Sequence, residues 1–179
     1  CMQTALNHYG RGVAHSVLGH IDEALAAQQA FRTAVANVPD ERHIHVVSCQ
    51  AILAVAEEML AGELEYRRKN YDQAFTHLRQ AVVNEDNLPY DEPWGWMQPS
   101  RHALGALLLE QGEGEDAAAA YRADLGLDDT VIRSNQHPDN IWALMGLHDC
   151  YQRLGKTSEI QMLKPRLGFA LARADLPIK

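Results

Sequence analysis

Residues 87–125 read NLPYDEPWGWMQPSRHALGALLLEQGEGEDAAAAYRADL. Three prolines in the first part of this stretch exclude a continuous helix. Its aromatic side chains are too apolar to leave in water, since burying one large side chain is worth roughly 1.5–3 kcal/mol. We therefore expect an ordered loop over residues 84–99. From Ser100, a plausible N-cap, the sequence predicts two short helices that reverse at Gly112.

The spacing of small residues around that reversal recurs along the chain. Intervals of seven and then five residues separate three positions. We expect the first to allow close packing of the two helices of a hairpin, the second to form a tight reversal, and the third to lie where the second helix crosses the first. The four sets are Gly12, Gly19 and Ala24; Gly62, Lys69 and Ala74; Gly105, Gly112 and Ala117; and His148, Gly155 and Ile160. The sequence thus predicts helical hairpins over about residues 4–39, 41–83, 100–125 and 140–174.

These small residues and turn glycines resemble the pattern of tetratricopeptide (TPR) proteins. The resemblance implies an all-α, TPR-like α-solenoid of about four helical hairpins, forming a single array over residues 1–179. A standard repeat is about 34 residues long. The hairpins here are farther apart, so we expect connectors longer than those of the family.

The segment YDEPWGWMQPSRHALGALLLEQG, with YRADLGL after it, is more specific. It is similar to a fungal and bacterial group of TPR proteins with a YDEPWGWMQPxRHALGALLLEQG-type segment, and the match covers nearly the whole chain. Longer members of that group carry a histidine-rich N-terminal half and a short cysteine-containing tail. The resemblance therefore implies that the chain is a fragment of a longer protein.

Composition limits the partners that we expect. The 24 acidic and 16 basic residues give a net charge of −8, which argues against nucleic acid and anionic membranes, since both require a basic face. No apolar run is long enough to predict a membrane span. Three cysteines fit a reducing compartment, and we expect a cytoplasmic location. The sequence leaves the oligomeric state undetermined.

A protein or peptide partner is the ligand that helical arrays usually bind, through their inner groove. In the predicted register, the first helix of each hairpin presents a mixed aromatic, apolar and polar surface. Its residues are Tyr9, Val13, Ser16, Met59, Glu63, Tyr66, His102, Leu109, Met145, Asp149 and Gln152. Clustered Lys and Asn are lacking there, so we expect weak or no binding of acidic C-terminal tails. Tyr90, Trp94 and Trp96 either fill the gap between the second and third hairpins or line a ligand pocket.

Histidine and cysteine raise the alternative of a metal site. His45 and Cys49 are four residues apart on a predicted helix and would share a face, where imidazole and thiolate suit copper or zinc. The simpler interpretation is a buried thiol beside a surface histidine. His8 and His15 lie on one helical stripe and His102 begins the third hairpin, so these three are further candidate ligands. The simpler interpretation of His8 and His15 is that they are core histidines in packing positions.

Two functions follow from these observations. The first is a TPR-type scaffold for protein–protein interaction, favoured because the repeat is the strongest signal and no complete catalytic motif is present. We accordingly predict no catalytic residue and no cofactor other than a transition metal. The alternative is a metal-dependent enzyme (copper, zinc or iron) of specialised metabolism, whose histidine ligands are shared with a missing N-terminal half. Convergence of three or more of the candidate ligands would distinguish the two.

Overall fold

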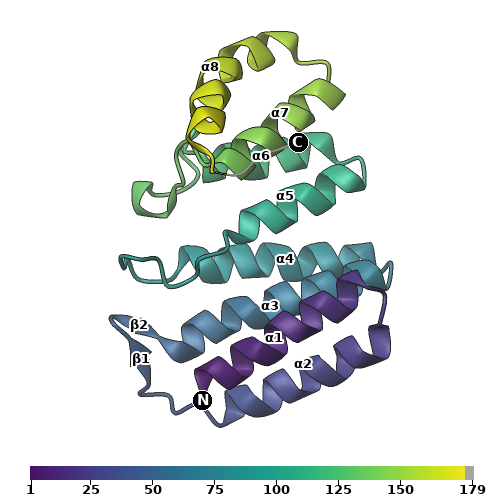
Figure 1. Ribbon diagram of the computed structural model, residues 1–179, viewed down its shortest axis with the longest axis vertical. Helices are drawn as coiled ribbons and strands as arrows, with labels where there is room; N and C mark the ends of the chain where they lie inside the picture. The colour runs from purple at the N-terminus through teal and green to yellow at the C-terminus, as the bar shows by residue number, and fades with distance from the viewer. Residues whose placement is uncertain (176–179) are drawn as a thin grey trace. The chain divides into compact units, whose positions relative to one another are not determined.

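The computed structural model describes residues 1–175, and these residues are predominantly helical (Figure 1). They form eight α-helices, one short 3-10 helix (η1) and one two-stranded antiparallel sheet. The elements are α1 Met2–Val17, α2 Ile21–Ala36, β1 His43–Ile44, β2 Val47–Ser48, α3 Cys49–Arg67, α4 Tyr71–Asp86, α5 Ser100–Glu110, α6 Gly114–Asp124, η1 Arg133–Asn135, α7 Ile141–Arg153 and α8 Thr157–Arg173. The all-α prediction is confirmed. None of the helices within residues 1–175 is both long and apolar enough to cross a membrane.

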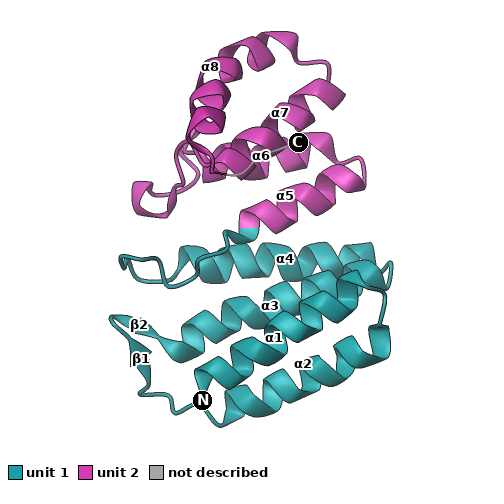
Figure 2. Cartoon of the chain, viewed as in Figure 1, with its two compact units in different colours: residues 1–100 teal, residues 101–179 magenta. Residues whose placement is uncertain are grey.

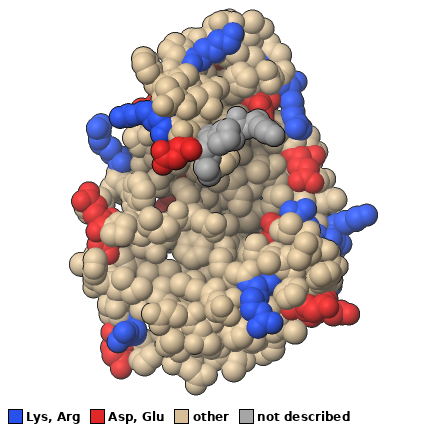
Figure 3. Space-filling view, viewed as in Figure 1, with Lys and Arg blue, Asp and Glu red and all other residues tan. Residues whose placement is uncertain are grey.

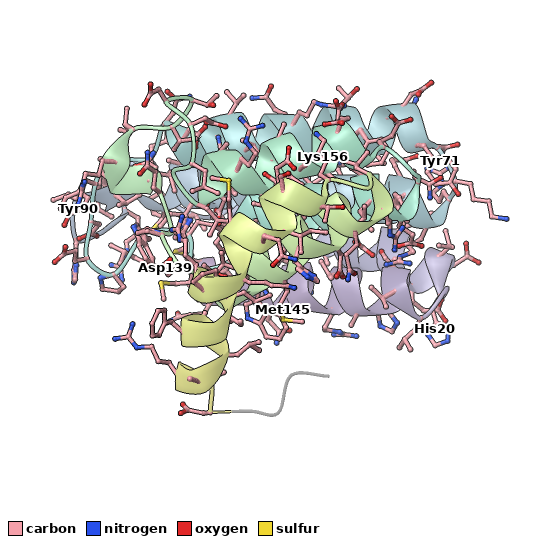
Figure 4. The ribbon with its side chains drawn as sticks, turned by 90° about the horizontal axis from the view of Figure 1, so that it is seen from above. His20, Tyr71, Tyr90, Asp139, Met145 and Lys156 are labelled. Atoms are coloured by element: carbon pink, nitrogen blue, oxygen red, sulfur yellow. The ribbon has the colours of Figure 1, made fainter. Side chains whose placement is uncertain are left out.

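The chain divides into two compact units, residues 1–100 and residues 101–179 (Figure 2). In the first unit, α1 packs against α2 and α3, and α3 also packs against α2 and α4. The turns at His20 and Tyr71 lie at one end of this unit and the loop that carries Tyr90 at the other (Figure 4). Its core is built from large apolar side chains that are fully buried, among them Phe31 and Leu60.

In the second unit, α7 packs between α6 and α8. The ring of Tyr121 lies against the backbone of two other helices, because a Cβ atom built on either Gly105 in α5 or Gly146 in α7 would overlap it. Cys150 in α7 is fully buried in this unit. The two glycines therefore let a large aromatic ring come close to two helices at once.

One turn geometry closes all four helical hairpins. The residue at each reversal has a positive φ: 77° at Gly19, 66° at Lys69, 87° at Gly112 and 69° at Gly155. In each turn the next residue donates its backbone N–H to the carbonyl five residues earlier, at 2.9–3.0 Å, as in His20 N to His15 O. This is the Schellman pattern of helix termination. The prediction of a reversal at these four positions is confirmed.

At the first position of the register, a glycine lets a side chain of another helix pack closely against its backbone. At Gly12 that helix differs from the predicted one. A Cβ atom on Gly62 would lie 2.7 Å from Leu78 Cγ of α4, and one on Gly105 would lie 2.7 Å from Tyr121 Cζ of α6, as expected for helices within one hairpin. At Gly12 the atom 2.7 Å away is Leu60 Cδ1 of α3, which belongs to the next hairpin. The prediction that this position always contacts the second helix of its own hairpin is therefore wrong at Gly12.

Residues 41–48 differ from the prediction of a long helix. They form a β-hairpin in which His43 pairs with Ser48 and Ile44 with Val47, and α3 begins only at Cys49. His45 has a φ of 51°, which no right-handed helix allows. Adjacent β-branched residues favour the extended backbone here over the helical one.

The loop between α4 and α5 is only partly packed. Trp96 is buried, with its ring centroid 5.5 Å from that of Tyr9, and Gly95 lies against Val47 of the β-hairpin. Tyr90, Trp94 and Met97 remain 58, 44 and 64 % exposed. The expectation that all the large apolar side chains of this loop would be buried is therefore wrong for these three residues.

Candidate functional site

The candidate site of the first unit is the surface formed by α1 and α3 beside the loop that follows α4. Tyr9 of α1 is half-buried there and meets Trp96 edge-on, with an interplanar angle of 74°. Burial, together with the carboxylate of Glu63 in α3, raises the pKa of Tyr9 to about 12. The phenol is therefore neutral at physiological pH and can donate a hydrogen bond.

Glu63 is held in place from its own helix. The Arg67 Nε atom donates to Glu63 Oε1 at 2.7 Å, and the Arg67 guanidinium lies 5.4 Å from the ring centroid of Tyr66. An ion pair thus positions the Glu63 carboxylate, and the same arginine makes a cation–π contact with the buried ring of Tyr66. Aromatic and arginine side chains of this kind are enriched at protein interfaces.

The residues predicted to form a groove divide by exposure. Tyr9, Val13, Glu63, His102 and Met145 are partly exposed, and Asp149 and Gln152 are exposed. Ser16, Met59, Tyr66 and Leu109 are buried, at 0, 8, 4 and 7 % exposure, so their prediction as surface residues is wrong.

The buried residues of this set are held by contacts within their own unit. The Ser16 hydroxyl donates to Gly12 O at 2.8 Å, and the ring of Tyr66 packs against Tyr71 and Phe75 of α4. For a helix that packs on two neighbours, apolar periodicity alone does not show which residues are exposed and which are buried.

The predicted metal ligands do not form a site. His45 lies in the β-hairpin with its Nδ1 3.4 Å from Asp91 Oδ1, whereas Cys49 is buried at the start of α3. The argument that they share a helical face is wrong because the helix begins after His45. Within residues 1–175, no group of three or more His, Cys, Asp or Glu side chains is arranged to hold a metal ion, and this includes His8, His15 and His102.

The second unit contains a polar cluster that sequence reasoning missed. Asp124, only 1 % exposed, accepts a hydrogen bond from His102 Nε2 at 2.9 Å and another from His137 Nδ1 at 2.8 Å. Burial raises the pKa of the Asp124 carboxyl, but the two histidines more than offset this and hold its pKa below the ordinary value. The sequence does contain a sign that Asp124 is buried, since it follows Ala117 and Tyr121 at intervals of four and three on the buried face of α6.

This histidine–aspartate cluster joins parts of the second unit that are distant in sequence. His102 comes from α5, Asp124 ends α6 and His137 lies in the connector before α7. The backbone N–H of His137 also donates to Asp124 O at 2.7 Å. With 19 and 9 % of their side chains exposed, His102 and His137 offer little surface to a ligand, and we interpret the cluster as structural.

Comparisons with protein-family models, with curated proteins and with solved structures find no match to this chain. On the face shown in Figure 3, basic and acidic side chains lie close together and do not gather into a field of one sign. Of the surfaces described, the one around Tyr9, Val13 and Glu63 combines partial exposure with aromatic, apolar and charged groups.

Proposed function

We propose that this chain is a TPR-like helical-repeat protein that binds a protein or peptide partner through the surface of α1 and α3. The repeated hairpin turn carries the proposal. In all four hairpins the turn after the first helix contains a residue with positive φ and the same hydrogen bond, at the positions that the seven-and-five register predicts. A unit that recurs in this way is typical of repeat proteins, in which each repeat packs on its neighbours.

Helix packing in the first unit supports the same proposal. The first helix of one hairpin, α1, packs against both its partner α2 and the first helix of the next hairpin, α3. Such neighbour-to-neighbour packing leaves one surface of the first helices for a ligand. Tyr9 and Val13 are four residues apart on α1 and share a face, and Glu63 adds a carboxylate from α3.

The proposal is tested by selecting peptides from a random display library for binding to the chain. We expect that Val13→Lys weakens binding of the selected peptides at least tenfold, because the charge would lie among the apolar contacts. Ala26→Lys is the matched control, since Ala26 is exposed on α2 and the substitution adds the same charge. Peptides that bind both variants as well as the parent chain would refute the proposed surface, and so would a selection that yields no binder.

A further inference from the structure

The first unit contains a pocket at the end opposite its helical turns. Its volume is about 510 Å³, and it lies between the first turn of α1, the segment that follows α2, and β1 with the start of α3. In Figure 1 these segments meet near the N-terminus and β1. The volume falls in the range of about 300–1,000 Å³ that is usual for small-molecule sites.

The walls of the pocket are mainly apolar. Met2 and Leu6 come from α1, Val38 from the segment after α2, and Ile44 from β1. Ile44 is 46 % exposed, so it offers apolar surface that a ligand would cover. Because apolar surface gains free energy when it is removed from water, such walls favour a ligand with a hydrocarbon body.

One charged side chain, that of Arg42, borders the pocket. The backbone of Arg42 is fixed, because its carbonyl accepts from the N–H of Cys49 at 2.9 Å. Its guanidinium is exposed and forms no ion pair or side-chain hydrogen bond with the described residues. A guanidinium beside apolar walls is suited to a carboxylate, which it can bind through two parallel hydrogen bonds.

We propose that this pocket binds a small organic carboxylate with an apolar body, the carboxylate at Arg42 and the body against Met2, Leu6, Val38 and Ile44. A linear alkanoate such as decanoate has the required chemistry, and 1-decanol has a similar body without the charge. The pocket shares none of the residues Tyr9, Val13 and Glu63 of the proposed partner surface, and the two proposals are tested with different ligands, so each can fail without the other.

Cys49 reports occupancy of the pocket. Cys49 lines the pocket although the residue is only 1 % exposed, so a ligand that fills the pocket would cover the side of Cys49 that faces it. Cys150 is fully buried in the other unit and serves as an internal control. A bound ligand is expected to slow alkylation of Cys49 and to leave Cys150 unchanged.

The experiment combines calorimetric titration of decanoate, below its micellar concentration and at pH 7, with mass-spectrometric alkylation of Cys49. We expect saturable binding, protection of Cys49, and affinity lowered on the order of fivefold by Arg42→Gln, the effect of losing one exposed ion pair. Arg11→Gln, an exposed change of equal charge on α1 outside the pocket, should leave the affinity unchanged.

Three outcomes would overturn the proposal. Absence of saturable decanoate binding would show that the pocket is not a carboxylate site. Binding without protection of Cys49 would place the ligand elsewhere. Equal affinity for 1-decanol, with no effect of Arg42→Gln, would show an apolar cavity that does not recognise the carboxylate.

Discussion

The contact between Gly105 and the ring of Tyr121 offers a sharp test of how the second unit is packed. In Gly105→Ala, the new Cβ atom would lie 2.7, 2.8 and 3.1 Å from three atoms of the ring. Carbon atoms in contact normally lie about 3.5–4.0 Å apart. The ring of Tyr121 has little room to move away from α5, because it also packs against Gly146 of α7. Such overpacking typically costs about 1–3 kcal/mol.

Gly168→Ala is the matched control for this substitution. Gly168 lies inside α8 of the same unit, and a Cβ atom there would meet nothing within 4 Å. Both substitutions gain about 1 kcal/mol of helix propensity. Comparing the two variants removes that gain and leaves the packing cost of about 1–3 kcal/mol.

Alkylation of Cys150 under native conditions measures this difference. The thiol is fully buried, and burial, with Asp149 adding to the effect, raises its pKa to about 11, so it reacts when the unit opens. When closing is fast, the rate follows the open population. We expect Gly105→Ala to react about 5- to 150-fold faster than Gly168→Ala. Cys49, in the first unit, is the internal reference.

Equal Cys150 rates in the two alanine variants would refute the packing argument. A second arm places Gly105→Ala in a Tyr121→Ala background, which removes the ring atoms that the new Cβ atom would overlap. There the added cost should largely disappear. If the cost remains, the ring of Tyr121 is not its source.

Three other substitutions have expected outcomes. Lys69→Gly should stabilise the first unit by about 0.5–1 kcal/mol in urea unfolding, because Lys69 has a φ of 66°; destabilisation would contradict this turn geometry. Asp124→Asn should destabilise the second unit by about 2–3 kcal/mol at pH 7. Because folding lowers the pKa of Asp124, its contribution to stability is present at pH values above the ordinary carboxyl pKa near 4 and is lost as the pH falls through the folded pKa. The Asp124→Asn variant should therefore lose less stability than the parent chain on acidification. Trp96→Ala should cost about 3 kcal/mol or more and Trp94→Ala less than about 1 kcal/mol, since only Trp96 is buried; equal losses in thermal unfolding would contradict this difference.

The sequence predicted the helical hairpins well because their turns depend on local chemistry. A reversal with positive φ favours glycine, so glycine in the sequence marks the turn. Gly19, Gly112 and Gly155 all occupy such turn positions. At Lys69 no glycine marks the reversal, and the seven-and-five register predicts the turn at that position. Alanines at the crossing position, such as Ala24 and Ala74, are fully buried, which accounts for the second interval of the pattern.

The sequence predicted the candidate site less well because exposure depends on contacts between distant segments. Met59 and Tyr66 share the helical face that was expected to be open, yet α3 packs on three other helices and buries them. Helical spacing places Asp124 on the buried face of α6, but its partners His102 and His137 lie 22 residues before it and 13 residues after it, and no local pattern specifies them. The prediction that His45 and Cys49 share a helical face fails because it assumes a helix across both residues, whereas His45 lies in a β-hairpin.

Site-specific photocrosslinking tests the central claim, a partner surface on α1 and α3, most directly. A benzophenone side chain is introduced at position 13 or at position 26, and each variant is irradiated with a peptide selected for binding to the parent chain. The proposal predicts crosslinks from position 13, which shares a face of α1 with Tyr9, and none from position 26 on α2. Crosslinks from position 26 alone, in variants that still bind the peptide, would contradict it.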